Sequence, residues 1–397
     1  MTTQNKAKRL LTSEDEIDWL GNVLIRSDLN VPISNGNVLD NFRIKKSIEY
    51  IEDLQNISTS ITFISHLGRP KGPEDSLSLK PISDEISKLL NQDVVFINNN
   101  LDEDIKNILK TKEKGIFLLE NLRFNEGEIR NDEKFAKSLA NPFDTYILDA
   151  FGASHREHAS IVKIGNHLNS FQGPLMSKEI EELDKVLNVS NEDFTIILGG
   201  AKVSDKLELI KNLLPRVNSL LIGGGMCFTF LKALGNNIGN SLCEDEFIES
   251  AKEILDSADG KKITLPVDFG VTKTIDSHAR TNIHLSQFSD DDIGVDIGKE
   301  TVNKFQEILS KSKTIFWNGP MGVFEVDEFS FGTKEITKAI AEMEVYSIVG
   351  GGDSVNAINK FSSVDKFNHV STGGGASLEY LEGKALPGVN IYNQLII

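Results

Sequence analysis

The chain has 397 residues, 39% of them hydrophobic and 25% charged, a balance typical of soluble globular proteins and unlike that of disordered or fibrous chains. Its net charge of −17 argues against nucleic acid as a partner, because the averaged field repels a phosphate backbone. Two cysteines exclude a disulfide framework and are typical of a reducing compartment.

Targeting and membrane signals are missing from the sequence. The first twenty residues include Glu14, Asp15, Glu16 and Asp18 and lack the apolar core of a signal peptide. No apolar stretch approaches the roughly 20 residues that span a bilayer. We therefore expect a cytoplasmic protein with no membrane contact, long enough for two domains.

In the first half of the chain, short apolar runs alternate with longer amphipathic stretches. Apolar residues recur at helical spacing over 43–54 and 81–90. Alternation of strands and helices predicts a parallel sheet covered by helices. The runs that read as buried strands are 23–25, 61–64, 94–97, 116–119 and 146–148.

A domain boundary is expected near Gly173-Pro174. The segment 175–189 that follows carries several acidic residues among leucines at helical spacing. This pattern predicts a helix that bridges two domains, while a surface helix inside one domain remains the alternative.

Four apolar runs in the second half end in glycine clusters. A loop without Cβ atoms lets a phosphate approach backbone N–H groups at a helix N-terminus, where the dipole also favours an anion. One cluster is often only a tight turn, but four after successive strands predict a nucleotide site. With further strands at 263–265 and 314–317, the second half predicts a second doubly wound domain. The clusters are Phe194-Thr-Ile-Ile-Leu-Gly-Gly-Ala-Lys202, Leu220-Leu-Ile-Gly-Gly-Gly-Met226, Tyr346-Ser-Ile-Val-Gly-Gly-Gly-Asp353 and His369-Val-Ser-Thr-Gly-Gly-Gly375.

Basic and imidazole side chains of the first half follow strands or begin helices. Arg43 falls in the first turn of a predicted helix, where a positive charge is intrinsically unfavourable. Ligands of open parallel sheets bind beyond the carboxyl ends of the strands, and guanidinium groups there suit a multiply charged anion. Singly, each arginine also fits a surface ion pair. The candidates are Arg26, Arg43, His66, Arg69, Arg123, Arg156 and His158.

Other chemistries have weaker support. Cys227 lies in an apolar run and reads as a core residue rather than a nucleophile. His155 and His158, with Asp149 nearby, favour anion binding over metal ligation. The chain has no Gly-x-x-x-x-Gly-Lys-Ser/Thr motif, which excludes a P-loop enzyme, and no Gly-x-Gly-x-x-Gly after the first strand, which disfavours a dehydrogenase.

Eight motifs, in family order from about residue 20 onward, resemble those of phosphoglycerate kinases. The first four are Arg26-Ser-Asp-Leu-Asn-Val-Pro32, Ser65-His-Leu-Gly-Arg-Pro70, Leu118-Leu-Glu-Asn-Leu-Arg-Phe124 and Asp149-Ala-Phe-Gly-Ala-Ser-His-Arg156. The others are Gly199-Gly-Ala-Lys-Val-Ser-Asp-Lys206, Trp317-Asn-Gly-Pro-Met-Gly-Val-Phe-Glu325, Gly350-Gly-Gly-Asp353 and Ser371-Thr-Gly-Gly-Gly-Ala-Ser377.

The resemblance implies two Rossmann-like domains joined by a hinge helix. The expected ranges are 1–173 for 3-phosphoglycerate, 174–190 for the helix, 191–375 for the nucleotide and 376–397 for a segment that returns to the first domain. It also implies reversible in-line phosphoryl transfer between 1,3-bisphosphoglycerate and ADP with Mg²⁺, by a monomer whose domains close.

The resemblance assigns roles to individual residues. Arg43 and Lys202 would neutralise the transferring group, Glu325 would meet the ribose, Asp353 would bind Mg²⁺, and Gly373-Gly374 would form a helix N-terminal loop at the reaction centre. The 3-phosphoglycerate set is Asp28, Asn30, Arg43, His66, Arg69, Arg123 and Arg156. The nucleotide set is Lys202, Lys206, Gly223, Gly224, Asn318, Glu325, Gly350, Gly351, Gly352, Asp353 and Ser354.

Some positions depart from the family's pattern. Ser27 stands where valine is usual, and Ala153-Ser154 replaces Thr-Ala. Ser354 replaces threonine but keeps the hydroxyl, so nucleotide binding should survive. The segment 171–178 departs from the usual glycine-rich pattern, which bears on the hinge rather than the chemistry. A dehydrogenase and a non-catalytic interaction protein are the rival hypotheses.

Overall fold

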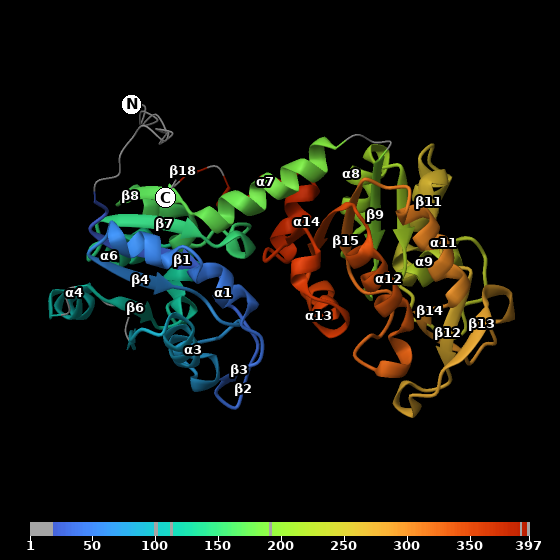
Figure 1. Ribbon diagram of the computed structural model, residues 1–397, viewed down its shortest axis with the longest axis horizontal. Helices are drawn as coiled ribbons and strands as arrows, with labels where there is room; N and C mark the ends of the chain where they lie inside the picture. Colours follow the sequence, from blue (N-terminus) through green and yellow to red (C-terminus); the bar gives the residue numbers. More distant parts are fainter. Residues whose placement is uncertain (1–18, 99–101, 112–113, 190–192, 390, 395–397) are drawn as a thin grey trace. The chain divides into compact units, whose positions relative to one another are not determined.

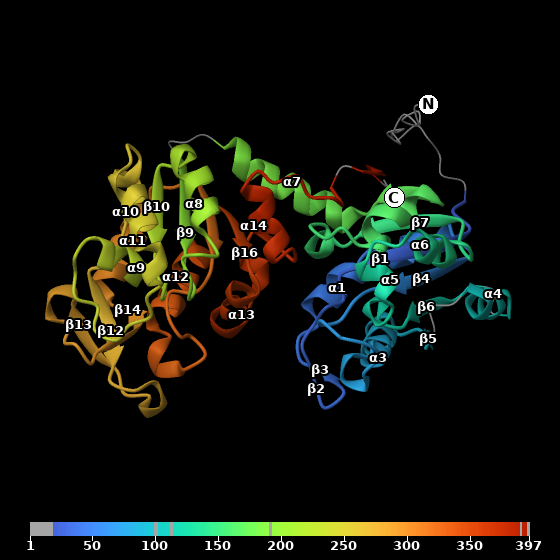
Figure 2. The same cartoon turned by 180° about the vertical axis from the view of Figure 1, so that it is seen from behind.

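The computed structural model describes residues 19–98, 102–111, 114–189, 193–389 and 391–394. The chain divides into two compact units, Met1–Glu181 with Ala385–Ile397, and Glu182–Lys384. Each unit contains a parallel sheet with helices packed against it (Figures 1 and 2). The predicted fold class, two doubly wound α/β domains, is confirmed. Within the described residues, no helix is both long and apolar enough to cross a bilayer.

The first unit is built on a seven-stranded sheet in the order β18-β8-β7-β1-β4-β6-β5. All neighbouring strands run parallel. From central β1 the chain moves to β4 on one side, and β7 later pairs with β1 on the other, so a topological switch point lies between β1 and β7. The strands are β1 (Asn22–Ser27), β4 (Ser60–Ile64), β5 (Val94–Ile97), β6 (Ile116–Leu119), β7 (Thr145–Asp149), β8 (Asn169–Gln172) and β18 (Asn393–Gln394).

Helices cover this sheet and bury its strands. Ile25, Phe63 and Ile147 of the sheet share one core cluster with residues of the helices, as expected for a parallel sheet covered on its faces. The helix predicted over 43–54 is interrupted at Tyr50, which has a non-helical φ of −109° and is buried. The helices are α1 (Phe42–Ile48), α2 (Ile51–Asn56), α3 (Lys80–Leu90), α4 (Asp102–Thr111), α5 (Glu126–Ile129) and α6 (Glu133–Ala140).

The second unit is built on a six-stranded parallel sheet in the order β11-β10-β9-β15-β16-β17. The chain runs outward from β9 through β10 to β11, and outward from β15 through β16 to β17. A topological switch point therefore lies between β9 and β15, where ligands of doubly wound sheets bind. The strands are β9 (Phe194–Leu198), β10 (Ser219–Ile222), β11 (Ile263–Thr264), β15 (Thr314–Asn318), β16 (Tyr346–Gly350) and β17 (His369–Val370).

The helices of the second unit follow its strands, as the sequence predicts. Four of them begin shortly after a glycine cluster, namely α8, α9, α13 and α14. Their N-termini therefore point toward the carboxyl edge of the sheet. The helices are α8 (Leu207–Leu213), α9 (Cys227–Ala233), α10 (Ile248–Asp256), α11 (Lys299–Leu309), α12 (Phe331–Glu342), α13 (Gly352–Phe361) and α14 (Gly375–Leu381).

Two small antiparallel sheets were not predicted. In the first unit, β2 (Ile33–Ser34) and β3 (Asn37–Val38) form a hairpin around Asn35-Gly36. Both turn residues have positive φ, as a tight hairpin turn requires. In the second unit, β12 (Asp268–Thr272) pairs with β13 (Thr281–His284) and with β14 (Ile293–Ile297).

Helix α7 (Pro174–Asn188) begins at the predicted boundary, and the division between the units falls inside it. Asp149 at the end of β7 caps its N-terminus, because Oδ1 accepts a hydrogen bond from the N–H of Met176 at 2.9 Å. A carboxylate is favourable at a helix N-terminus. Gly173 is closely packed here, since a Cβ would lie 2.3 Å from Asp149 Oδ1.

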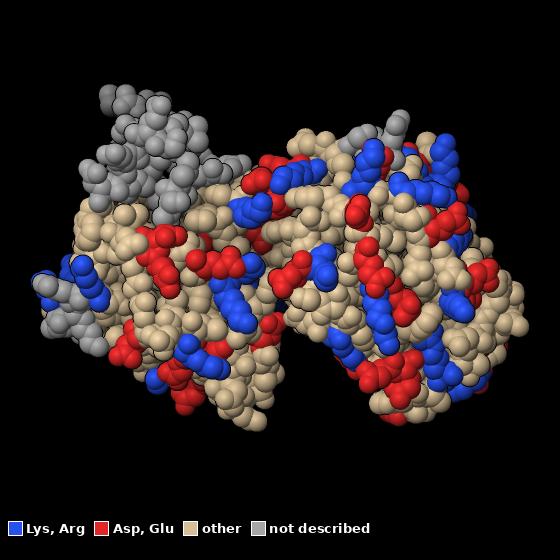
Figure 3. All heavy atoms as spheres, viewed as in Figure 1, with Lys and Arg blue, Asp and Glu red and all other residues tan. Residues whose placement is uncertain are grey.

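Charged side chains are interspersed on the surface. On the face drawn in Figure 3, acidic and basic groups alternate over both units rather than gathering by sign. On this face, therefore, neither sign of charge forms a large patch.

Candidate active site

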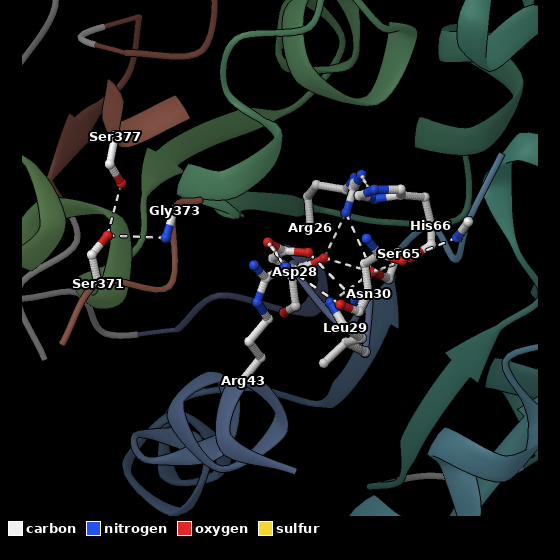
Figure 4. A network of polar contacts seen from close by, with 12 residues as sticks. Arg26, Asp28, Leu29, Asn30, Arg43, Ser65, His66, Ser371, Gly373 and Ser377 are labelled. Carbon is white, nitrogen blue, oxygen red and sulfur yellow. Dashed lines mark hydrogen bonds and ion pairs between the residues drawn. The ribbon is translucent and has the colours of Figure 1, made fainter. Parts of the chain in front are cut away.

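The loop after β1 holds Arg43 beside the sheet edge of the first unit. Arg43 Nη1 donates to Asp28 Oδ2 at 2.9 Å and to the carbonyl of Asn30 at 3.3 Å (Figure 4). Asn30 Oδ1 in turn accepts from the N–H of Gly68 at 3.0 Å. The buried carboxylate of Asp28 compensates the charge that Arg43 brings to the first turn of α1.

His66 lies against a fully buried arginine. Arg26 Nη2 is 3.0 Å from His66 Nδ1, and Arg26 is 0% exposed (Figure 4). Burial, followed by the charges of Arg26 and nearby cations, lowers the pKa of His66 well below its usual value. The imidazole is therefore neutral at physiological pH.

Arg123 is a third partly buried basic group at this edge. Its Nη1 donates to the carbonyl of Gly68 at 2.6 Å, while its buried Nε has no hydrogen-bond partner. Burial first, then repulsion by Arg26, Arg156 and Arg69, lowers its pKa to about 10 even though Glu128 opposes the change. We call Arg26, Arg43, His66, Arg69, Arg123 and Arg156 the cation cluster.

In the second unit, two adjoining hollows lie at the carboxyl edge of the sheet. An apolar hollow of about 330 Å³ is lined by residues that include Phe228, Leu242 and Val295. A polar hollow of about 740 Å³ is lined by residues that include Lys202 and Lys206. Gly200, Ala201, Pro320 and Asp353 line both.

Glycines let the loops after β9, β10 and β15 meet. Gly224 has a φ of +62°, and a Cβ there would lie 2.6 Å from the N atom of Gly200. A side chain at Gly224 would therefore be strained and would separate the loops. The backbones form one wall at the switch point between β9 and β15.

Polar groups of the polar hollow are held by α13 and its neighbours. Asp353 is exposed in the first turn of α13, and Lys206 is only 9% exposed. Burial lowers the pKa of Lys206, and the charges of Asp205 and Asp353 oppose that change. Asn318 Nδ2, on the wall of the hollow, is a buried donor without a partner, so a ligand oxygen there would satisfy it.

A family model described as phosphoglycerate kinase matches residues 16–384. The chain belongs to the phosphoglycerate kinase family. It is 48% identical over 390 residues to the phosphoglycerate kinase of Dictyoglomus turgidum, which covers 97% of this chain and 98% of that protein. It is 47% identical over 379 residues to the phosphoglycerate kinase of Finegoldia magna, and the match covers 94% of this chain and 96% of that protein.

Solved structures of the family agree. The phosphoglycerate kinase of Coxiella burnetii superposes with a TM-score of 0.83 at 37% identity, over 96% of this chain and 98% of that chain. The phosphoglycerate kinase of Pyrococcus horikoshii superposes with a TM-score of 0.84 at 33% identity, over 95% of this chain and 97% of that chain. The chain is thus a phosphotransferase that interconverts 1,3-bisphosphoglycerate with ADP and 3-phosphoglycerate with ATP, which excludes the dehydrogenase alternative.

Most residues of the predicted nucleotide set line one of the two hollows. Glu325 lines the apolar hollow, and Lys202, Lys206, Asn318, Gly351, Gly352, Asp353, Ser354 and Gly374 line the polar one. Ser354 Oγ accepts from the N–H of Gly319 at 2.7 Å, so its hydroxyl braces the loop after β15.

Three expected backbone donors lie elsewhere. Gly223 donates to the carbonyl of Leu198 at 2.8 Å and extends the sheet ladder, and Gly350 is the last residue of β16. The N–H of Gly373 donates to Ser371 Oγ at 3.1 Å (Figure 4). Gly223 and Gly350 thus extend or end a strand, and the later glycines of their clusters line the hollows.

Alternatives for cysteine and histidine chemistry are not supported. Cys227 is buried, and burial raises the pKa of its thiol far above the usual value. In the described part of the chain, no three His, Cys, Asp or Glu side chains are grouped to hold a metal ion. His158 instead lies 3.6 Å from the buried carboxylate of Glu128.

The sequence did not reveal the apolar hollow. Phe228, Leu242 and Val295 look like ordinary core residues, and the last belongs to the unpredicted β14. Glu128 was missed because a lone glutamate in a short polar helix carries no motif.

Proposed function

We propose that Arg43, His66, Arg69, Arg123 and Arg156 of the cation cluster, with Asp28 and Asn30, bind 3-phosphoglycerate or 1,3-bisphosphoglycerate. The observation that carries this proposal is Arg123, whose Nη1 is fixed by the carbonyl of Gly68 at 2.6 Å while its buried Nε has no partner. Burial first, and then the charges of Arg26, Arg156 and Arg69, lower its pKa to about 10. A multiply charged anion relieves such repulsion and accepts hydrogen bonds from guanidinium groups. The unpaired Nε of Arg123 is one donor that the ligand would satisfy.

The two hollows of the second unit suit ADP or ATP. The nucleoside would occupy the apolar hollow, with Glu325 accepting from ribose hydroxyls. The phosphates would lie in the polar hollow, where Lys202, Lys206 and the N-terminus of α13 offer positive charge and N–H groups.

The donor set of the polar hollow fits Mg²⁺ bound with the nucleotide. The exposed carboxylate of Asp353 supplies one hard oxygen ligand, and phosphate oxygens and water would supply the others. The ion would neutralise charge on the phosphates. Lys206 would keep the phosphates near Asp353.

Transfer would proceed in line from one ligand to the other. Neither a carboxylate nor an acyl phosphate needs a general base, so charge stabilisation and positioning dominate. Lys202 and Arg43 would stabilise the transferring group. Because they belong to different units, the reaction would require closure of the units about α7, which also excludes water from the acyl phosphate.

Calorimetric titration tests the two half-sites separately. Arg123→Met should weaken 3-phosphoglycerate binding by about tenfold or more, through loss of charge-assisted hydrogen bonds, and leave ADP binding unchanged. Lys206→Met should do the reverse. Arg130→Met is the control, because Arg130 lies just after α5 and forms only an exposed ion pair with Glu126. Loss of both ligands in either variant would contradict separate half-sites.

Small-angle scattering tests closure. The radius of gyration should fall with both substrates together and change little with either alone. Arg43→Ala should lower kcat strongly with modest effect on substrate affinity. Equal radii in all states, with Arg43→Ala altering only KM, would refute closure.

We also propose that the enzyme is a cytoplasmic monomer. Light scattering after size exclusion measures its mass in solution and so tests the oligomeric state.

A further inference from the structure

A buried glutamate lies behind the cation cluster of the first unit. Glu128 in α5 is 0% exposed. Its carboxylate accepts hydrogen bonds from the N–H of Ser160 at 2.9 Å and from Ser160 Oγ at 2.6 Å. Burying an ionised carboxylate is costly unless other groups pair with it, so its surroundings must hold it in place.

The hydrogen bonds continue from Ser160 to the imidazole. Ser160 Oγ gives its single proton to Glu128 and accepts from Arg26 Nε at 3.0 Å. Arg26 is fully buried, and its Nη2 lies 3.0 Å from His66 Nδ1. Ser160 itself is fixed in the π-helical turn η4 (Ala159–Lys163), where its carbonyl accepts from the hydroxyl of Tyr146.

We call the series Glu128, Ser160, Arg26 and His66 the relay. Its donors and acceptors have only one arrangement. A guanidinium group can donate but cannot accept, so His66 Nδ1 must accept from Arg26. The imidazole proton is then on Nε2. A protonated imidazole would place two donors face to face, beside cations on several sides.

The charges around the relay agree with this arrangement. Burial alone would raise the pKa of Glu128, but the neighbouring His158, the charge of Arg26 and the hydrogen bonds from Ser160 lower it overall. Glu128 is thus the buried counter-charge of Arg26, acting through Ser160. The groups facing His66 are Arg26, Arg123, His158 and Arg43, all cationic or imidazole.

We propose that Glu128 is a positioning residue for substrate binding, because through Ser160 and Arg26 it fixes His66 as a neutral donor at Nε2. This inference rests on the proposed placement of His66 in the 3-phosphoglycerate site. Without the charge of Glu128, Arg26 loses its buried counter-charge and keeps only its hydrogen bonds to the carbonyl of Ser27 and to Ser65 Oγ on that side of the group. Its donation to His66 Nδ1 is then held less firmly, so His66 populates both tautomers and donates less well to the substrate.

Nitrogen-15 NMR of the histidine rings, combined with kinetics, tests the relay in the full chain. The wild type should show His66 with an unprotonated Nδ1 and a protonated Nε2 across pH 5 to 8. Glu128→Gln and Ser160→Ala should yield a mixture of the two neutral tautomers. KM for 3-phosphoglycerate should rise about tenfold or more, with kcat and the KM for MgATP changed far less. Ser160→Ala breaks the same series of hydrogen bonds but keeps the carboxylate of Glu128, so it tests the relay even if Glu128→Gln does not fold.

Glu126→Gln is the matched control, because Glu126 is exposed on the same helix and pairs with Arg130. It should leave the tautomer and both KM values unchanged. An unchanged His66 tautomer in both relay variants, or an equal rise in the KM of both substrates, would overturn the inference. A third outcome separates the relay from the substrate site. If wild-type His66 has its proton on Nε2 but its nitrogen-15 signals do not shift when 3-phosphoglycerate is added, the placement of His66 in the substrate site is overturned. The relay is then still supported.

Discussion

Replacing Gly199 by alanine should disrupt the wall on which nucleotide binding depends. A Cβ at Gly199 would lie 2.1 Å from the carbonyl oxygen of Pro320. That carbonyl accepts from the N–H of Gly200 at 2.9 Å, so it cannot retreat without breaking the contact between the loops after β9 and β15. Overpacking of this kind costs about 3 kcal/mol or more, which corresponds to a Tm lower by roughly 6–12 °C for a unit of this size.

Calorimetry of Gly199→Ala and ADP titration measure the two expected effects, a lower Tm and weaker ADP binding. Gly375→Ala is the control, because nothing lies within 4 Å of its hypothetical Cβ and its Tm should stay near that of the wild type. If Gly199→Ala unfolds within about 2 °C of the control and binds ADP normally, the close-packed glycine wall is not needed and the reasoning fails.

Three further predictions follow from single side chains. Lys202→Ala should lower kcat in a coupled assay by roughly two to four orders of magnitude, the scale for losing one stabiliser of transition-state charge. Lys311→Ala is the control and should turn over normally, because Lys311 forms only an exposed ion pair with Glu307. Asp353→Asn should raise the Mg²⁺ concentration for half-maximal rate by about tenfold; an unchanged magnesium titration would move the metal ligand elsewhere. Burial raises the pKa of Asp149 from 3.8 to about 6. The native state therefore binds this proton more tightly than the unfolded chain does. The free energy of unfolding should fall by about 3 kcal/mol as pH rises from about 4 to about 6. Urea unfolding of Asp149→Asn should lack this fall, and parallel pH profiles of the two proteins would contradict the assignment.

Patterns local in sequence predicted much of the fold. An apolar run followed by glycines marks a buried strand and the loop after it, because both features arise within a few residues. The same rule placed Asp353 at the carboxyl edge of the second sheet, where it lines the polar hollow. Asn318, which lines the same hollow, was assigned only through the family resemblance.

Features that depend on distant partners could not be predicted in this way. Ser160 lies 32 residues after Glu128 and 134 after Arg26, and no spacing rule connects them. The strand β12 is short, contains Gly270, and pairs on both sides with strands that the sequence did not mark. The apolar hollow beside β14 was therefore hidden, although each of its residues is ordinary.

The most direct test of the account follows the acceptor of the phosphoryl group. The protein is incubated with MgATP, 3-phosphoglycerate and hydroxylamine, which traps an acyl phosphate as a hydroxamate. Direct transfer to the carboxyl group predicts that ADP and the hydroxamate of 3-phosphoglycerate form in equal amounts, that both substrates are required, and that Lys202→Ala is nearly inactive. Release of ADP without hydroxamate, or full activity of Lys202→Ala, would contradict direct transfer to the carboxyl group at this site.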